Sequence, residues 1–441
     1  MKRLTLLLFL LVPLSNAFAQ DPVLLPVRLT LDDAIARARQ SSPRLASLSA
    51  LSRAASEGVR GASAGRRPEL DLSASYTRNS NVPELILSFP GSAPRTIFPN
   101  LPNNWRAHAG ATLPLYTGGR IEGQVDAAKE TSRATTSDRA AAENDLVAET
   151  HVAYVNVLFA RENARVLREA VASYESHLKD AKNRLEMGLV ASHEVLSVTV
   201  ERERAELGRI QSENAATTAI ANLLRLVGLP AGTPVELDAA PLAAAPPSPA
   251  ATEAAIKRAV EGRPELDALR ARIRAMDASA RVARSASRPQ AGLLAGYDYA
   301  NPNQRILPLA GEWKDSWSLG LNLNWKVLDG GRASASVAQA QAQSEALRAQ
   351  LADLEARIRL DVATRQMELD SAMAGTLVAQ RGIEAARDAV RVARDRYREG
   401  VLTSSELLDA ETRLMRAELD AAQTGAQIQV AMANLTRAVG R

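Results

Sequence analysis

From Leu31 onward, most of the chain consists of one sequence pattern that occurs twice. In the downstream part of each copy, equivalent residues lie 212 positions apart: Trp105 and Trp317, Gly118 and Gly330, Gly119 and Gly331, Gly188 and Gly400, Glu194 and Glu406. Upstream the separation is 221, as between the Arg-Pro pairs at 67–68 and 288–289. The first copy therefore holds nine extra residues between Tyr76 and Trp105, where a surface loop would vary in length. A unit of about 210 residues is too long for a solenoid repeat, so we expect two half-molecules related by a pseudo-twofold axis.

The first 19 residues are organised like a secretory signal peptide. Lys2-Arg3 forms the charged region, Leu4 to Leu14 the short apolar core, and Ala17-Phe18-Ala19 an A-x-A cleavage site. We therefore expect cleavage after Ala19 and export of the remaining chain. The alternative, a membrane anchor, is disfavoured because a membrane-spanning helix needs about 20 apolar residues.

The composition argues against several functions. The chain has no cysteine, so it forms no disulfide and carries no lipid on an N-terminal cysteine. Its 54 basic and 50 acidic residues are interspersed, which does not favour nucleic acid as a partner. The histidines at 108, 151, 177 and 193 lack metal-ligand spacing, and no catalytic or dinucleotide-binding motif occurs. We expect neither an enzyme nor a cofactor or metal site.

Long proline-free windows favour long helices. No proline occurs between Pro114 and Pro230, or between Pro308 and the C-terminus, so both windows can be helical throughout. In the first window, mainly apolar residues recur in alternating steps of 4 and 3 from 146 to 185, and a weaker repeat runs from 358 to 397. A 3.5-residue period sustained over about six heptads predicts a coiled coil.

The pattern predicts the same order of elements in both copies. The first repeat, 20–238, is expected to contain an opening helix at 31–64, a β-hairpin at 68–115, a long helix at 120–187 and a shorter helix at 191–227. A Pro/Ala linker at 239–251 leads to the second repeat, 252–441, with an opening helix at 252–286, a hairpin at 289–327, a long helix at 332–399 and a helix at 402–439. Each long helix would span roughly 100 Å at 1.5 Å per residue.

The predicted strands alternate apolar and polar residues. The clearest runs from Trp317 to Val327, with tryptophan, leucine and valine on one face and serine, glycine, asparagine and lysine on the other. Runs of this length can cross a bilayer as tilted strands; the alternative is a soluble antiparallel sheet with one face on a core. Four strands cannot close a membrane barrel. Two chains would pool 8 strands and three would pool 12, each being a multiple of the four expected per chain.

Three motifs occur once in each copy. Thr/Asp-Gly-Gly-Arg follows the second strand, Arg-x-x-x-Gly and Glu-x-Leu flank the turn after the long helix, and Asn-Leu-x-x-x-x-Gly ends the copy. In these motifs, over nearly the whole mature chain, the sequence resembles the TolC-like outer-membrane efflux proteins. The resemblance implies a mainly α fold with membrane β-strands: a long α-helical coiled-coil periplasmic barrel, and four strands per chain in a 12-stranded barrel shared by a homotrimer.

The same resemblance implies a function and partners. The trimer would be a passive exit duct in the outer membrane for a tripartite efflux pump or a type I secretion system. A periplasmic adaptor protein would dock at the helix tips, and an inner-membrane transporter of the RND or ABC type would supply the energy. The alternative that we consider is a periplasmic coiled-coil scaffold or adaptor without a pore. The cargo is not indicated by the sequence.

The turns are the first group of candidate residues. Gly118, Gly119, Gly330 and Gly331 are interpreted as strand-to-helix turns, since they lack the spacing of a phosphate-binding loop. The turns after the long helices are helix caps in the simplest interpretation, with Ser192 and Ser404 as N-caps. The resemblance adds adaptor docking at these tips, with exposed apolar side chains. Its residues are Gly188, Leu189, Val190, Ser192, Gly400, Val401, Leu402 and Ser404.

The second group would form a gate. Glu406 and Asp409 lie three residues apart and match the positions of the acidic constriction rings in this family; the simpler alternative is a solvated helix face. Tyr397 matches a tyrosine that clasps the neighbouring coiled coil in the closed state, with Glu194 at its acceptor position. Packing in the heptad core is the competing role for Tyr397. Leu402 stands where the family archetype has an arginine, so fewer polar links, or different ones, would hold the closed state.

Overall fold

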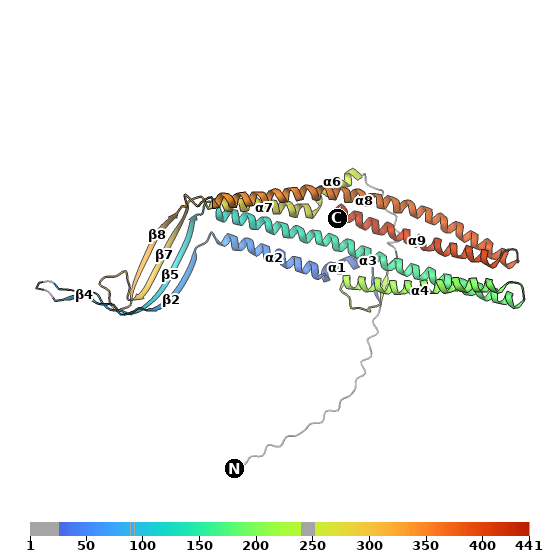
Figure 1. Ribbon diagram of the computed structural model, residues 1–441, viewed down its shortest axis with the longest axis horizontal. Coiled ribbons are helices and arrows are strands. Elements are labelled where there is room, and N and C mark those ends of the chain that lie inside the picture. Colours follow the sequence, from blue (N-terminus) through green and yellow to red (C-terminus); the bar gives the residue numbers. More distant parts are fainter. Residues whose placement is uncertain (1–25, 89, 92, 240–251, 441) are drawn as a thin grey trace, which may run out of the picture.

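The structure is a computed structural model that describes all residues except 1–25, 89, 92, 240–251 and 441. The molecule is a long rod: helices form most of it, a four-stranded sheet continues it at one end, and two helix turns form tips at the other (Figure 1). The expected signal peptide, 1–19, and all but the first residue of the expected linker lie outside the described residues.

Both copies contain the same principal elements. The first copy contains β1 (Val27–Leu29), α1 (Leu31–Ser41), α2 (Pro43–Ala64), β2 (Glu69–Arg78), β3 (Leu85–Leu87), β4 (Arg95–Phe98), β5 (Asn103–Tyr116), α3 (Arg120–Glu186), α4 (Ser192–Val227) and β6 (Val235–Leu237). The second contains α6 (Thr252–Gly262), α7 (Pro264–Ser285), β7 (Gln290–Asn301), β8 (Lys314–Asn324), α8 (Arg332–Arg398) and α9 (Ser404–Ala438). The two long helices, α3 and α8, have 67 residues each.

The prediction of a single opening helix in each copy is wrong. Ser42 separates α1 from α2, and Arg263 separates α6 from α7. Both residues have extended backbone angles, φ −67° and ψ 114° for Ser42 and φ −74° and ψ 124° for Arg263. The cause is the following proline, because its ring disfavours the helical conformation of the residue before it. Pro43 and Pro264 then start the next helix, where a missing N–H costs nothing.

The heptad positions form the core of the rod. All twelve positions from 146 to 185 in α3, and all twelve from 358 to 397 in α8, are buried or partly buried. Helix α3 lies in the middle and packs against α2, α4, α7 and α9, whereas α8 packs against α6, α7 and α9. At mid-length, the buried Tyr154 hydroxyl donates to the carbonyl oxygens of Leu29 and Asp238, at 2.9 Å each. These contacts tie α3 to the last residue of β1 and to the residue after β6.

The principal sheet has the strand order β2-β5-β7-β8, with every pair antiparallel. Pairing of β5 with β7 joins the two copies, so β2 and β8 are the edges. One face is apolar and exposed in the single chain; Leu72, Trp317 and Leu321 are 86%, 72% and 71% exposed. Strand β8 ends at Asn324, before Trp325 and Val327, so the second hairpin is shorter than predicted.

The long segment between β2 and β5, expected to be a loop, contains the small β3–β4 hairpin.

Among the described residues, no helix has the length and apolar character needed to cross a membrane.

Candidate functional site at the helical tips

The glycine pairs lie where a strand passes into a long helix. Gly118 and Gly119 precede α3 with φ of 65° and 90°, and Gly330 and Gly331 precede α8 with φ of 69° and 84°. Side chains strain this left-handed backbone, so glycine fits all four positions. The surroundings differ: a Cβ on Gly118 would lie 2.8 Å from the Cβ of Arg288, whereas a Cβ on Gly330 would meet nothing within 4 Å. Among the described residues, an added Cβ would thus meet the other copy at Gly118 but not at Gly330.

The two tip turns are built alike. Gly188 after α3 and Gly400 after α8 have φ of 73° and 76°, the left-handed conformation that ends many helices. The two apolar residues that follow each glycine differ in their exposure to solvent. Leu189 and Val401 are 67% and 74% exposed, as expected for a contact surface. Val190 and Leu402 were also expected to be exposed, but both are partly buried. Leu402 packs against the core around Tyr397.

The prediction that Ser192 and Ser404 are N-caps is wrong, since each is the first residue of its helix. The cap of α4 is Ala191, which offers no side-chain oxygen, and the cap of α9 is Thr403. The Thr403 hydroxyl accepts from the Glu406 N–H at 3.3 Å, while the Glu406 carboxylate accepts from the Thr403 N–H at 2.9 Å. This reciprocal capping box places the N-cap of α9 at Thr403, one residue before Ser404.

The two predicted gate acids lie on the exposed side of α9. Glu406 and Asp409 are exposed, while the two leucines between them are buried: Leu407 against α8 and Leu408 against α3 and α4. Hydrogen bonds from the backbone and side chain of Thr403 lower the pKa of the Glu406 carboxyl below its ordinary value. Glu406 therefore carries its negative charge at neutral pH, and its carboxylate is fixed at the helix start.

Tyr397 is held by α3. Its ring is 4% exposed; the Arg184 guanidinium carbon lies 4.2 Å from the ring centroid, and Arg184 donates to the Tyr397 carbonyl at 2.8 Å. Among the described residues the Tyr397 hydroxyl has no hydrogen-bond partner, and the nearby Ser404 hydroxyl is bonded to His177. Burial raises the pKa of Tyr397, and the charge of Glu194 adds to the shift. Glu194 thus lies within electrostatic range without a hydrogen bond to Tyr397.

A buried polar cluster, which we call the tip joint, lies beside this tyrosine. It consists of Ser173 and His177 from α3, Arg394 from α8, and Ser404 and Glu411 from α9. The Glu411 carboxylate is bonded to His177 Nδ1 at 3.1 Å and accepts from the Ser173 hydroxyl and Arg394, at 2.9 Å each. His177 Nε2 is 2.9 Å from the Ser404 hydroxyl. The side chains of His177 and Glu411 are 2% and 5% exposed.

The tip joint connects the two copies near the tips. Its bonds cross from α3 to the α8–α9 hairpin, and the Tyr174 hydroxyl adds a contact of 3.0 Å to the hydroxyl of Thr412. Burial opposes ionisation of Glu411, but the bonds from His177, Arg394 and Ser173 outweigh it, so the pKa of Glu411 is lowered. The hairpin cannot leave α3 without exposing or breaking this ionic cluster.

Sequence reasoning missed the tip joint. His177 was considered only as a metal ligand, and Glu411 was not considered. A signal was present: Ser173 and His177 are polar residues four positions apart on one helix face. Among the described residues, no group of three or more histidine, cysteine, aspartate or glutamate side chains could hold a metal ion.

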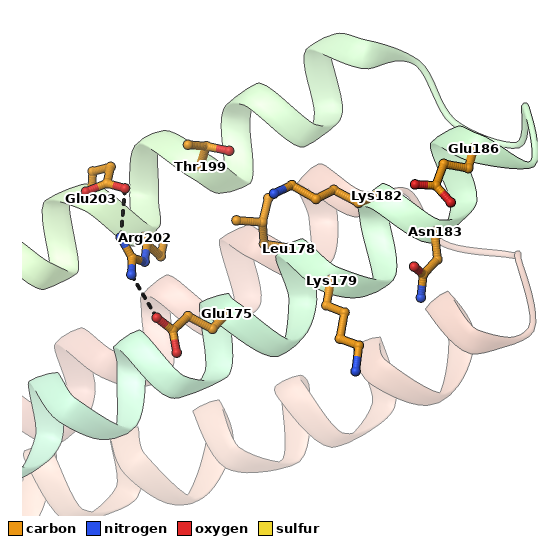
Figure 2. A pocket seen from close by; sticks show the side chains of 9 residues that line it. All are labelled: Glu175, Leu178, Lys179, Lys182, Asn183, Glu186, Thr199, Arg202 and Glu203. Carbon is orange, nitrogen blue, oxygen red and sulfur yellow. Dashed lines mark hydrogen bonds and ion pairs between the residues drawn. The ribbon is translucent and has the colours of Figure 1, made fainter.

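A groove of about 550 Å³ lies between α3 and α4 close to the first tip. Figure 2 shows its lining, with Arg202 of α4 bridging Glu175 of α3 and Glu203 of its own helix, at 2.8 Å each. The lining is charged and of mixed sign: Glu175, Leu178, Lys179, Lys182, Asn183, Glu186, Thr199, Arg202 and Glu203. The groove extends the surface of the tip toward the middle of the rod.

Solved structures of outer-membrane channels have this fold. The outer membrane protein VceC from Vibrio cholerae has a TM-score of 0.77 at 20% identity, over 93% of this chain and 96% of that one. The open state of the MtrE channel from Neisseria gonorrhoeae has a TM-score of 0.77 at 19% identity, over 93% and 88%. The chain therefore shares the fold of these channel subunits.

The sequence profile of the outer membrane efflux protein family matches residues 34–229 and 255–441, one stretch in each copy. The chain belongs to the outer membrane efflux protein family. It is 24% identical to the outer membrane protein TolC of Vibrio cholerae over 92% of this chain and 89% of that protein. It is 26% identical to the outer membrane protein OprJ of Pseudomonas aeruginosa, over 75% and 69%. The family is one of transport channels, and its location is the outer membrane.

Proposed function

We propose that three copies of the chain form an outer-membrane channel, which serves as the passive exit duct of a tripartite efflux pump or a type I secretion system. The observation that carries this proposal is the junction between the two copies inside the chain. There β5 of the first copy pairs with β7 of the second, and α3 packs against α7. Ion pairs from Arg272, Arg274 and Arg281 of α7 to acidic residues of α3 reinforce the contact.

Repetition of this junction between chains supports the ring. The duplicated sequence gives β8 and α8 the same position in the second copy that β5 and α3 have in the first. Their partners would be β2 and α2 of the next chain, which are equivalent to β7 and α7. A contact of this head-to-tail kind closes into a ring when the rotation fits. Three chains bring twelve strands, enough for a closed barrel without an edge.

The faces of the sheet support an orientation in the membrane. The exposed leucine and tryptophan side chains of β2 and β8 would face lipid, and the opposite, polar face would line the lumen. The helical rod would then extend into the periplasm as a hollow bundle. Export by a signal peptide cleaved after Ala19 belongs to this proposal.

The tips would be the docking end. Leu189 and Val401 are exposed beside the tip glycines, and the groove of Figure 2 lies next to the first tip. Exposed apolar residues at a rigid turn suit a protein contact. The partner in our proposal is a periplasmic adaptor, which would couple the duct to an inner-membrane transporter of the RND or ABC type.

The gate would lie on α9. Three copies of Glu406 and Asp409 would surround the narrow end with six carboxylates and favour cations. Tyr397 would hold the closed state by packing under Arg184, with Glu194 as the acidic residue nearby. The tip joint would anchor the α8–α9 hairpin to α3. Opening is then a movement of this hairpin away from α3, driven by the adaptor and the pump.

Purification and bilayer recording test the proposal. We expect the full chain to require detergent, to behave as a trimer and to give discrete conductance steps in planar bilayers. A water-soluble, elongated particle that gives no conductance would refute the duct and favour the alternative, a periplasmic scaffold without a pore. A matched variant with an arginine in place of Leu319, on the apolar face of β8, should lose insertion.

A further inference from the structure

A recess of about 440 Å³ lies at the end of the sheet that is remote from the long helices. We call it the strand recess. The loop after β7 covers part of it, and β2, β5 and β7 form its floor. Most of its lining residues are polar, the exceptions being Trp105, Ala300 and Pro302: Ser75, Thr77, Asn79, Asn104, Trp105, Arg106, Asp298, Ala300, Pro302, Asn303, Gln304 and Arg305. No part of the gate or the docking surfaces uses these residues.

Strand register places the strand recess on the polar face of the sheet. Ser75 pairs with Arg106, and His108 pairs with Asp298, so these four side chains share one side. The neighbouring residue, Trp105, pairs with Tyr76, and their rings contact at 4.3 Å on the opposite, apolar side. In the proposed channel the strand recess therefore opens to the lumen and not to lipid.

The first cation of the strand recess, the guanidinium of Arg106, is hydrogen-bonded only through its Nε atom among the described residues. Arg106 Nε donates to Asp298 Oδ1 at 2.6 Å, and His108 Nδ1 lies 2.8 Å from the same oxygen. The two terminal nitrogens of Arg106 have no hydrogen-bond partner among the residues that the structure describes. Their N–H groups are fixed in direction by the Asp298 bond and remain free to bind.

The loop after β7 supplies the second cation, the guanidinium of Arg305. Asn303, which is 5% exposed, anchors this loop by donating to the Lys314 carbonyl at 3.0 Å and to the Ser316 hydroxyl at 3.1 Å. Its side-chain oxygen accepts from the Arg305 N–H at 3.0 Å. One terminal nitrogen of Arg305 donates to the Trp317 carbonyl at 3.1 Å. A second guanidinium is thus positioned in the strand recess.

The charges of the strand recess are unbalanced. Asp298 is its sole acidic lining residue, and Arg106 and His108 already share that carboxylate. Two planar guanidinium groups with unused N–H donors match pairs of oxygens on a phosphate or a carboxylate. Hydroxyl and amide groups of Ser75, Thr77 and Gln304 offer further donors.

We propose that the strand recess is a binding site for an oxyanion, the phosphate or carboxylate group of a solute in the lumen. The site itself follows from the chain, and the assignment of its ligand to passing solute rests on the proposed channel. It would give the strand end of the duct the opposite charge preference to the acidic tip. Anionic solutes that leave the carboxylate ring would meet three such sites before the exit.

Equilibrium binding of inorganic phosphate to the full chain in detergent tests the site without requiring a pore. We expect saturable binding that weakens on the order of tenfold or more when Arg106 and Arg305 are both changed to glutamine, since each loses charge-assisted bonds. Arg95→Gln is the matched control, because it removes an exposed arginine of β4 outside the strand recess. Equal binding by all variants, or no saturable binding, would overturn the proposal.

Two further measurements separate the site from the channel. In bilayers with a phosphate gradient, the double variant should shift the reversal potential toward greater cation preference, whereas Arg95→Gln should not. Phosphate binding in a protein that forms no pore would leave the site standing and refute the channel. Competition between inorganic phosphate and phosphatidylglycerol vesicles for the wild-type recess would assign the ligand to lipid and overturn the lumenal solute.

Discussion

Replacement of Glu411 by glutamine tests whether the tip joint holds the α8–α9 hairpin in place. The substitution keeps the size of the side chain but removes its charge. The carboxylate serves three donors, on His177, Ser173 and Arg394. An amide has one acceptor oxygen and two N–H donors, so at least one of the three donors is left without an acceptor, and none keeps a bond to a full negative charge.

The magnitude follows from burial. Breaking a buried ion pair by removing one partner costs about 3–5 kcal/mol. The Arg394 side chain is 46% exposed and Glu411 only 5%, so water screens part of the loss and the low end applies. A loss of about 3 kcal/mol in the joined state would shift the ratio of open to closed tips by about 150-fold.

Single-channel recording measures the shift. We expect Glu411→Gln to raise the open probability of the channel at fixed voltage and salt. Glu418→Gln is the matched control, because Glu418 lies on the same helix and pairs with Arg387 of α8 at 3.1 Å, inside the hairpin. Thermal unfolding of both variants checks that they fold as the wild type does. Wild-type gating in Glu411→Gln, or equal opening in both variants, would refute the reasoning.

The same carboxylate predicts a response to acid. The pKa of Glu411 in the folded chain lies below its ordinary value of 4.5. A lowered folded pKa means that the stabilisation is fully present above the unfolded pKa and disappears as the pH falls through the folded value. Wild-type channels should therefore open as the pH falls below 4.5. Glu406 also has a lowered pKa, so the relevant quantity is the difference between wild-type and Glu411→Gln channels, which should vanish in acid.

Three further predictions concern other parts of the chain. Changing Glu406 and Asp409 together to alanine should reduce cation preference and divalent-ion block in bilayers; unchanged block would remove them from the gate. Gly123→Ala should lower the melting temperature, at a cost of about 1–3 kcal/mol, because its Cβ would lie 2.7 Å from a methyl group of Val282; Gly58→Ala, with nothing within 4 Å, should be neutral or stabilising. Leu321→Arg on the apolar sheet face should cost about 2–4 kcal/mol of membrane stability, measured by folding into vesicles, whereas arginine at the next residue, on the other face, should be tolerated.

Periodicity made much of this fold predictable. A 3.5-residue repeat over a proline-free window locates a long helix and its buried side, and the residues from 146 to 185 follow it throughout. Alternation over two residues locates the strands and their apolar face in the same way. These patterns depend only on local backbone geometry, so they can be recognised in the sequence of a single chain.

Two predictions were wrong although local signals in the sequence pointed to the right answer. The breaks before Pro43 and Pro264 follow from the restriction that proline imposes on the preceding residue, but the helical pattern on both sides hid them. Three hydroxyl residues in a row, Thr403, Ser404 and Ser405, left the position of the α9 cap ambiguous. Glu406 resolves it, since a capping box needs the acidic residue three positions after the cap.

Local sequence rules could not predict the tip joint. His177 and Glu411 lie 234 positions apart in the chain, and nothing local brings them together. Their contact depends on the relative rotation of three helices, which is set by packing along the whole rod. The strand recess is similar, because a loop after β7 has to fold back to place Arg305 beside Arg106.

In a single copy of this chain, β2 and β8 are unpaired edge strands of a sheet whose apolar side chains are exposed to water. Unpaired edge strands can pair with the wrong chain, and backbone groups without hydrogen-bond partners are not tolerated in lipid. In the proposed channel, a single newly exported copy would therefore be prone to aggregation and could not enter the bilayer by itself. Assembly with other copies and membrane insertion would then be one event, and dilution during biogenesis should produce aggregates and not membrane-inserted monomers.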